Sequence, residues 1–133
     1  MILQVGVKVL LKSDNNKYLF LKRSANFKPG VQKWDIPGGR INVDEKLDEA
    51  LAREVCEETG MELGKCELIA AQDIFAPDKD LHAVRLTYTA AALEESVTIS
   101  NEHSEYKWMT KEEVIDQPLD SYVAMLFQDN SQL

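Results

Sequence analysis

Three glutamates stand at a spacing that brings their carboxylates together on one side of a helix. Glu54, Glu57 and Glu58 occupy positions i, i+3 and i+4, which are neighbours on a helix surface. Two carboxylates about 5 Å apart repel by roughly 3 kcal/mol at an effective dielectric constant near 20, so such a group needs protons or cations. Because every ligand is a hard oxygen, the pattern favours Mg²⁺ or Mn²⁺ over zinc or copper. A magnesium ion held by few protein oxygens can bind phosphate oxygens and activate a water molecule.

The same segment carries an apolar stripe that is expected to face a core. Leu47, Ala50 and Leu51 have the spacing of a buried helix face, and about two turns further along the stripe continues as the three glutamates. A solvated, glutamate-rich helix is the alternative, but it would place the acids opposite the leucines. The acids also lie near the C-terminal end of the helix, where the macrodipole disfavours negative charge. We therefore predict three inward-facing carboxylates that need a bound cation.

A turn with little side-chain bulk precedes this helix. Pro37, Gly38 and Gly39 follow a short extended segment at 34–36. Because glycine has no Cβ, a backbone carbonyl at this turn can approach a metal ion directly. A purely structural turn explains the same residues, and both interpretations stay open at this point.

The rest of the chain predicts the elements that would position these groups. Hydrophobic periodicity predicts strands over 3–11, 18–21, 34–36, 68–75, 82–92 and 106–109, and helices over 46–59, from Thr110 and over 119–127. Asp44 is expected to cap the start of the first helix, and Gly60 is expected to end it. Thr110 and Glu113 form a capping box. Hairpins mixed with separated helices indicate an α/β protein, with a mixed β-sheet and helices on both faces.

Composition limits the class of protein. With 133 residues and 44% apolar side chains, we expect one domain over residues 1–133. No apolar run approaches the roughly 20 residues of a membrane helix, and no export signal is visible, so a membrane is not expected as a partner. The net charge of −8, without a clustered basic face, argues against nucleic acid. Isolated cysteines and histidines argue against disulfides and zinc, so a reducing, cytoplasmic setting is expected.

The segment 39–61 resembles the complete Nudix box. It reads GRINVDEKLDEALAREVCEETGM and contains the first glycine and glutamate, the Arg-Glu pair, the Glu-Glu pair, and the final glycine with its aliphatic neighbour. Every fixed position of the motif is present, which is a highly specific signal. The preceding WDIPG at 34–38 and the later Trp108 also resemble family members, so the likeness covers most of the chain.

The resemblance implies a Nudix-like α/β/α sandwich and Mg²⁺-dependent hydrolysis of a phosphoanhydride bond in a nucleoside diphosphate linked to a group X. The substrate would be a nucleoside triphosphate or a nucleotide sugar such as ADP-ribose, and the products a nucleoside monophosphate and a phosphorylated remainder. Mn²⁺ could replace Mg²⁺. The implied metal ligands are Glu54, Glu57, Glu58 and the carbonyl of Gly38. Arg53 would orient the glutamates through charge-assisted hydrogen bonds, while Gly39 and Glu45 would be structural or outer-sphere residues.

Family members often recruit one more acid from outside the box, as a ligand or general base. Glu102 and Glu105 are the candidates here. Glu102 is favoured because 101–104 is typical of a loop that can fold back, while Glu105 begins a strand. Both could instead be ordinary surface acids. Basic residues expected near the cleft could contact phosphates; they are Arg23, Lys28, Lys33 and Arg40.

Two other functions stay open. A non-catalytic, nucleotide-binding Nudix-like domain is disfavoured by the intact motif, and an RNA 5′-end pyrophosphohydrolase is disfavoured by the acidic balance. The identity of the nucleotide stays open because specificity is expected in loops such as 24–33 and 75–82. A small-molecule nucleotide is therefore the expected partner, and the family likeness also allows a homodimer.

Overall fold

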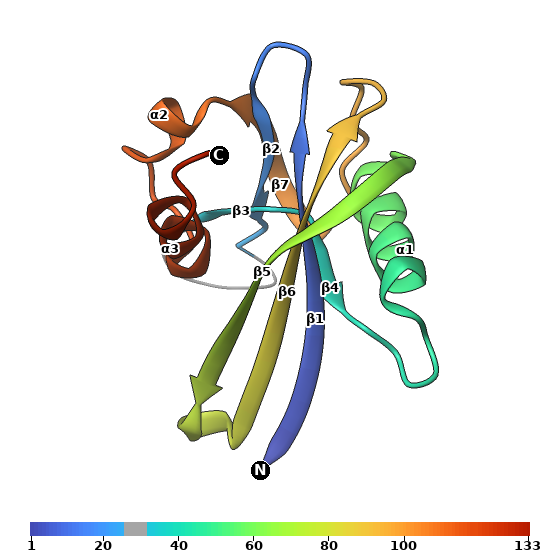
Figure 1. Cartoon of the computed structure of the whole chain (residues 1–133), viewed down its shortest axis with the longest axis vertical. Coiled ribbons are helices and arrows are strands. Elements are labelled where there is room, and N and C mark those ends of the chain that lie inside the picture. Colours follow the sequence, from blue (N-terminus) through green and yellow to red (C-terminus); the bar gives the residue numbers. More distant parts are fainter. Residues whose placement is uncertain (26–31) are drawn as a thin grey trace.

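The computed structural model describes residues 1–25 and 32–133, and its elements follow the predicted order. They are β1 (Ile2–Lys12), β2 (Tyr18–Arg23), β3 (Trp34–Asp35), β4 (Gly38–Arg40), α1 (Leu47–Thr59), β5 (Leu63–Ala76), a 3₁₀ helix (Pro77–Lys79), β6 (Leu81–Ala92), β7 (His103–Met109), α2 (Lys111–Val114) and α3 (Ser121–Asp129) (Figure 1). The short strand β4 forms where the sequence predicted only a turn. Lys28 and most of the expected loop 24–33 lie outside the described residues.

The described strands form one mixed sheet organised around β1. In the order β3-β2-β1-β6-β5, β1 runs parallel to β6 along its whole length, from Ile2–Leu81 to Lys12–Ala91. On its other side, β1 pairs first with β4 and then, at Lys12, with β2; these pairs and all the others are antiparallel. A parallel pair needs a long crossover connection. Because α1 belongs to that connection, it is placed on the sheet beside β1 and β4.

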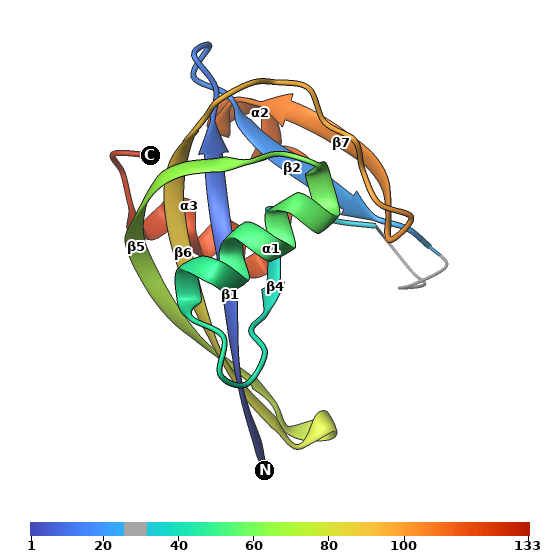
Figure 2. The ribbon, with the colours of Figure 1, turned by 90° about the vertical axis from the view of Figure 1, so that its right-hand side faces the viewer.

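Helices cover both faces of the sheet, as the sequence predicted (Figure 2). The buried cluster on the α1 face consists of Val7, Val9, Leu11, Leu19, Leu21, Ala50, Leu51, Val55, Met61 and Ala90. The buried cluster on the α3 face consists of Leu10, Tyr18, Phe20, Trp34, Ile36, Met109, Val114, Val123, Leu126 and Phe127. Successive side chains of a strand point to opposite faces, so β1 supplies both clusters.

The ends of α1 confirm one expected cap and correct the other. Gly60 ends the helix in the left-handed conformation, with φ of 70°, and its N–H donates to the carbonyl of Cys56. The expected N-cap, Asp44, is wrong: Lys46 is the N-cap, and its N–H donates to the Glu49 carboxylate at 3.1 Å. Asp44 itself has φ of 66°, so it belongs to the preceding turn and cannot cap the helix.

The last helix begins later than the sequence predicted. Asp120 caps α3, because its Oδ1 accepts hydrogen bonds from the N–H groups of Tyr122 at 2.9 Å and Val123 at 3.1 Å. Leu119, the expected first residue, instead stays extended and bridges Trp34 in β3. The capping box of α2 is as expected, with reciprocal bonds between Thr110 and Glu113. None of the helices in residues 1–25 and 32–133 is long and apolar enough to cross a membrane.

Candidate active site

The three glutamates of α1 differ strongly in burial. The side chain of Glu58 is 8% exposed and that of Glu54 is 16% exposed, so both face inward as predicted. Glu57 corrects the prediction, because its side chain is 59% exposed. The apolar stripe also shifts: Val55 is buried between the acids, whereas Leu47 is exposed. In the described chain, no three acidic, histidine or cysteine side chains converge closely enough to hold a metal ion.

Glu58 is the most strongly perturbed of the three acids. Burial raises its pKa to about 7; Glu54 and Asp35 repel its charge and add to this, while Lys8 and the Gly38 N–H oppose it. The Gly38 N–H donates to Oε1 of Glu58 at 2.8 Å. At neutral pH this carboxyl group is therefore only partly ionised, and a cation beside it would stabilise the ionised form.

Arg53 contacts three acids of the box. Its Nε and Nη2 bind both oxygens of Glu45, at 2.7 Å and 3.0 Å, and its Nη1 donates to Glu54 at 2.9 Å. Nη1 also lies 3.4 Å from Glu57, and Nη2 donates to the carbonyl of Arg40 at 3.1 Å. The hydrogen bond from Arg53 lowers the pKa of Glu45 to about 2. Glu45 thus fixes the guanidinium, and the guanidinium fixes Glu54.

The two glycines of β4 allow close approaches, Gly38 to the backbone of β1 and Gly39 to the side chain of Glu54. Gly38 has φ of 140°, and a Cβ there would lie 2.0 Å from the carbonyl oxygen of Val7. A Cβ on Gly39 would lie 2.6 Å from Oε2 of Glu54. The absence of side chains therefore lets β4 pack against β1 and lets Glu54 lie directly against the β4 backbone.

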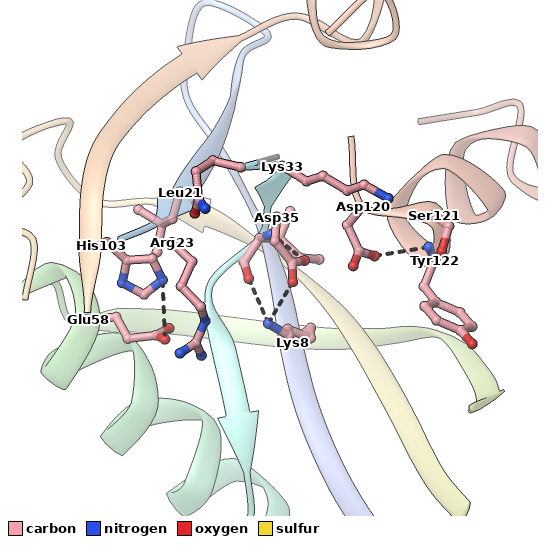
Figure 3. Close-up of a pocket in the computed structure, with 12 residues that line it drawn as sticks. Lys8, Leu21, Arg23, Lys33, Asp35, Glu58, His103, Asp120, Ser121 and Tyr122 are labelled. Carbon is pink, nitrogen blue, oxygen red and sulfur yellow. Dashed lines mark hydrogen bonds and ion pairs between the residues drawn. The ribbon is translucent and has the colours of Figure 1, made fainter. Parts of the chain in front are cut away.

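A cavity of about 340 Å³ adjoins Glu58 and contains an ion-pair network that the sequence analysis missed (Figure 3). Lys8 Nζ binds Asp35 at 3.3 Å and the carbonyl of Ile36 at 3.1 Å. Arg85 joins Asp35, at 2.9 Å, to Asp120, at 3.4 Å. Although burial alone would raise it, Lys8 and Arg85 hold the pKa of Asp35 well below its usual range. The one signal in the sequence is a charged residue within an apolar strand, as at Lys8 in 3–11.

His103 also lines the cavity, and the sequence did not single it out as a site residue. Its Nε2 lies 3.9 Å from Oε2 of Glu58, and its Nδ1 is buried without a hydrogen-bond partner among the described residues. Burial lowers the pKa of His103, and the nearby Arg23 and Lys8 lower it further. The neutral imidazole therefore forms one wall of the cavity beside the buried glutamate.

The two candidate acids outside the box lie in different surroundings. Glu102 precedes β7 in a turn, half-buried, next to His103, and its carbonyl accepts a hydrogen bond from the Ser24 N–H. Glu105 lies within β7 and pairs with Lys22 at 3.4 Å, so its carboxylate already has a cation. The expected loop is shorter than predicted because β7 begins at His103.

The basic residues predicted to contact phosphates separate into two groups. Arg23 and Lys33 line the cavity beside Glu58. Arg40 borders a different hollow, on β4, and Lys28 lies outside the described residues.

The donor set fits a hard divalent cation. Glu54, Glu57, Glu58 and the Gly38 carbonyl offer only oxygen atoms, the ligand type that Mg²⁺ and Mn²⁺ prefer. The raised pKa of Glu58 indicates a buried carboxylate without a full counter-charge.

The chain combines a mixed sheet between helices with glutamates that are hydrogen-bonded to an arginine beside a polar cavity. The NUDIX domain model matches residues 2–126, and the chain belongs to the Nudix family of hydrolases. The MutT protein from Methanosarcina mazei Go1 has the same fold, with a TM-score of 0.83 and 30% identity over 96% of this chain and 91% of that one.

Two curated relatives show how the similarity is distributed. The m7GpppN-mRNA hydrolase NUDT17 of Danio rerio is 44% identical over 64 residues, which is 48% of this chain but 21% of that protein. The nucleoside triphosphatase NudI of Escherichia coli is 25% identical over 118 residues, which is 82% of this chain and 84% of that protein. For four of the curated relatives, including NUDT17, the match to this chain covers only 20% to 34% of the relative's own length.

Proposed function

We propose that this chain is a Mg²⁺-dependent pyrophosphohydrolase that cleaves a nucleoside diphosphate linked to X into a nucleoside monophosphate and a phosphorylated remainder. The observation that carries the proposal is the buried Glu58, whose pKa is raised to about 7 and whose charge is repelled by Glu54. Glu58 lies at the wall of a cavity that is also lined by cationic side chains. Such a carboxylate is suited to binding a cation next to a bound diphosphate.

Each residue of the site receives a role in this proposal. Glu54, Glu57, Glu58 and the Gly38 carbonyl would hold the cations. When bound, the cations would neutralise charge on the diphosphate and lower the pKa of a water molecule. Arg53 keeps Glu54 against β4. Arg23 and Lys33 would bind phosphate oxygens from the cavity wall.

The proposed reaction needs a general base, and we propose the acid that precedes β7 for this role. As water attacks phosphorus, the bond from phosphorus to the bridging oxygen breaks, and a base must take the proton of the water. We assign this base to Glu102, because Glu105 is already paired with Lys22. Glu105 remains the alternative.

Hydrolysis at RNA 5′ ends is the second candidate, and the names of relatives favour it, since one is an mRNA hydrolase and another an RNA pyrophosphohydrolase. The net charge of −8 would repel the body of an RNA chain. We therefore rank free nucleotides first and expect capped RNA to be hydrolysed more slowly at physiological salt.

Product release from a panel of nucleoside triphosphates, nucleotide sugars and capped RNA tests the proposal. Activity should require Mg²⁺, persist with Mn²⁺, be poor with Ca²⁺ because of its looser coordination, and vanish in excess chelator. p-Nitrophenyl phosphate, the control substrate, should be turned over poorly because it lacks the second phosphate. Full turnover in excess chelator, or a phosphomonoester as the best substrate, would contradict the proposal.

Glu102→Gln should lower kcat by about 10²- to 10⁴-fold, the range of a lost general base. Glu105→Gln is the matched control and should change kcat by about twofold or less, since an exposed ion pair contributes little. Steady-state kinetics on the best nucleotide at saturating Mg²⁺ measures both. The reverse order would move the role to Glu105, and two small effects would place the base within the box.

A further inference from the structure

The two carboxylate oxygens of Glu58 lie against different groups. Oε1 accepts the hydrogen bond from the Gly38 N–H at 2.8 Å. Oε2 faces His103 instead, with Nε2 of the imidazole 3.9 Å away, as Figure 3 shows. The side chain of Glu58 is 8% exposed and that of His103 is 9% exposed, so the two groups meet where little water can reach them. His103 therefore lies next to the oxygen of Glu58 that Gly38 does not bind.

The backbone fixes the position of this imidazole. His103 is the first residue of β7, and its N–H donates to the carbonyl of Ser100 at 3.2 Å. The carbonyl of the preceding residue, Glu102, accepts a hydrogen bond from the Ser24 N–H at 2.7 Å. From His103 onward, β7 pairs with β2. The imidazole thus approaches Glu58 from a paired strand that is separate from α1.

The surroundings of the ring indicate which of its nitrogens carries the proton. Nδ1 of His103 is buried and has no hydrogen-bond partner among the described residues. A proton on Nδ1 would create a buried N–H without an acceptor, which is costly and rare in folded proteins. A proton on Nε2 instead points toward a carboxylate oxygen of Glu58. Burial, together with Arg23 and Lys8, lowers the pKa of His103, so the ring carries this single proton at neutral pH.

We propose that His103 is a positioning residue, which donates its Nε2–H to Oε2 of Glu58 and so holds this carboxylate in place for a divalent cation. This inference rests on the proposed function. A carboxylate has about four lone-pair sites, so the bonds from Gly38 and His103 leave sites for a cation. The distance of 3.9 Å belongs to the metal-free chain and is longer than an N–H···O bond; a cation that keeps Glu58 ionised would strengthen its attraction for the donor.

Asparagine and glutamine in place of His103 separate hydrogen-bond donation from proton exchange. Glutamine can place its amide N–H near the position of Nε2, whereas the shorter asparagine reaches only the region of Nδ1. Without substrate, His103→Asn should raise the Kd for Mn²⁺ by about tenfold or more, the scale for a lost partner of a metal ligand, and His103→Gln by about threefold or less. Electron paramagnetic resonance measures both constants. An unchanged Kd in His103→Asn, or equal losses in the two variants, would overturn the proposal.

The second histidine of the chain provides the matched control. His82 lies near the start of β6, where its Nε2 is 2.8 Å from Oδ1 of Asp73. His82→Asn should bind Mn²⁺ as wild type does, because this pair is remote from Glu58 in the sheet. A raised Kd in His82→Asn equal to that in His103→Asn would show a general loss of structure and overturn the assigned contact.

Steady-state kinetics separates positioning from proton transfer. In His103→Asn, the Mg²⁺ concentration for half-maximal activity should rise by about tenfold or more, while kcat at saturating Mg²⁺ should stay within about threefold of wild type. A fall in kcat of about 10²-fold or more in both variants at saturating Mg²⁺ would show that His103 itself exchanges a proton. That result would overturn the proposal.

The tautomer of His103 gives a readout that needs neither metal nor turnover. Nitrogen NMR of histidine-labelled, metal-free protein at mildly alkaline pH should show the proton on Nε2, and the spectrum of His82→Asn identifies the signals of His103. A proton on Nδ1 would overturn the proposal, even if the substituted proteins do not fold. Wild type that binds no Mn²⁺ would contradict the proposed function, whereas the tautomer would still decide the contact between His103 and Glu58.

Discussion

Glu58→Gln is expected to lower kcat by about 10²- to 10³-fold, because it removes charge from the buried acid of the box while keeping its shape. The glutamine oxygen can still accept the hydrogen bond from the Gly38 N–H, so β4 should stay in place. Glu57→Gln should cause a loss of similar size through the lost ligand charge. Steady-state kinetics with Mg²⁺ and titration with Mn²⁺ followed by electron paramagnetic resonance measure activity and metal binding separately.

Glu62→Gln is the control for this pair, because Glu62 is an exposed acid just beyond α1. It should leave both kcat and Mn²⁺ affinity at the wild-type level. A Glu57→Gln protein with near wild-type kcat would show that Glu57 is an ordinary surface acid. If Glu58→Gln also retained full activity, the assignment of the catalytic site to α1 would be wrong.

The metal-free protein should lose stability as pH rises from about 4.5 to about 7. The pKa of Glu58 is raised from 4.5 to about 7 in the folded chain, so folding favours its protonated form. Below pH 4.5 this group is protonated in both the folded and the unfolded chain, so it does not change the free energy of unfolding. Above pH 7 its ionisation destabilises the fold by about 3 kcal/mol. Urea denaturation in the presence of chelator at several pH values measures the trend.

Glu58→Gln should remove this loss and be the more stable protein at pH 8 without metal. The comparison between the two proteins is needed because His103 has the opposite effect. Its pKa is lowered in the folded chain, so its contribution to the stability of the fold increases as pH rises toward 6.5 and partly masks the trend in wild type. Glu45 and Asp35 have lowered pKa values, so their stabilising contribution stays constant above about pH 4.5 and is lost only at more acidic pH. Parallel stability curves for wild type and Glu58→Gln would contradict the assigned burial of Glu58.

Local patterns were sufficient for the box and for most elements. The spacing of Glu54 and Glu58, the position of Gly60 and the capping box at Thr110 each depend on residues within about one helical turn. Periodicity failed where tertiary contacts decide. Glu57 shares the sequence pattern of the other acids but lies outside the contact of α1 with the sheet, and Asp44 turns away before the helix begins.

The amino-acid sequence by itself indicated the chemistry that we propose for this protein: three carboxylates on one helix, an arginine beside them and two glycines at the preceding turn. Only the tertiary structure decided what surrounds them. Lys8 meets Asp35 across 27 positions, and Arg85 meets Asp35 across 50. These contacts arise because β1 lies between β6 and β2, and β2 pairs with β3, so Lys8 of β1 and Arg85 of β6 both reach Asp35 of β3. Such pairings depend on long-range packing, which no local spacing in the chain encodes.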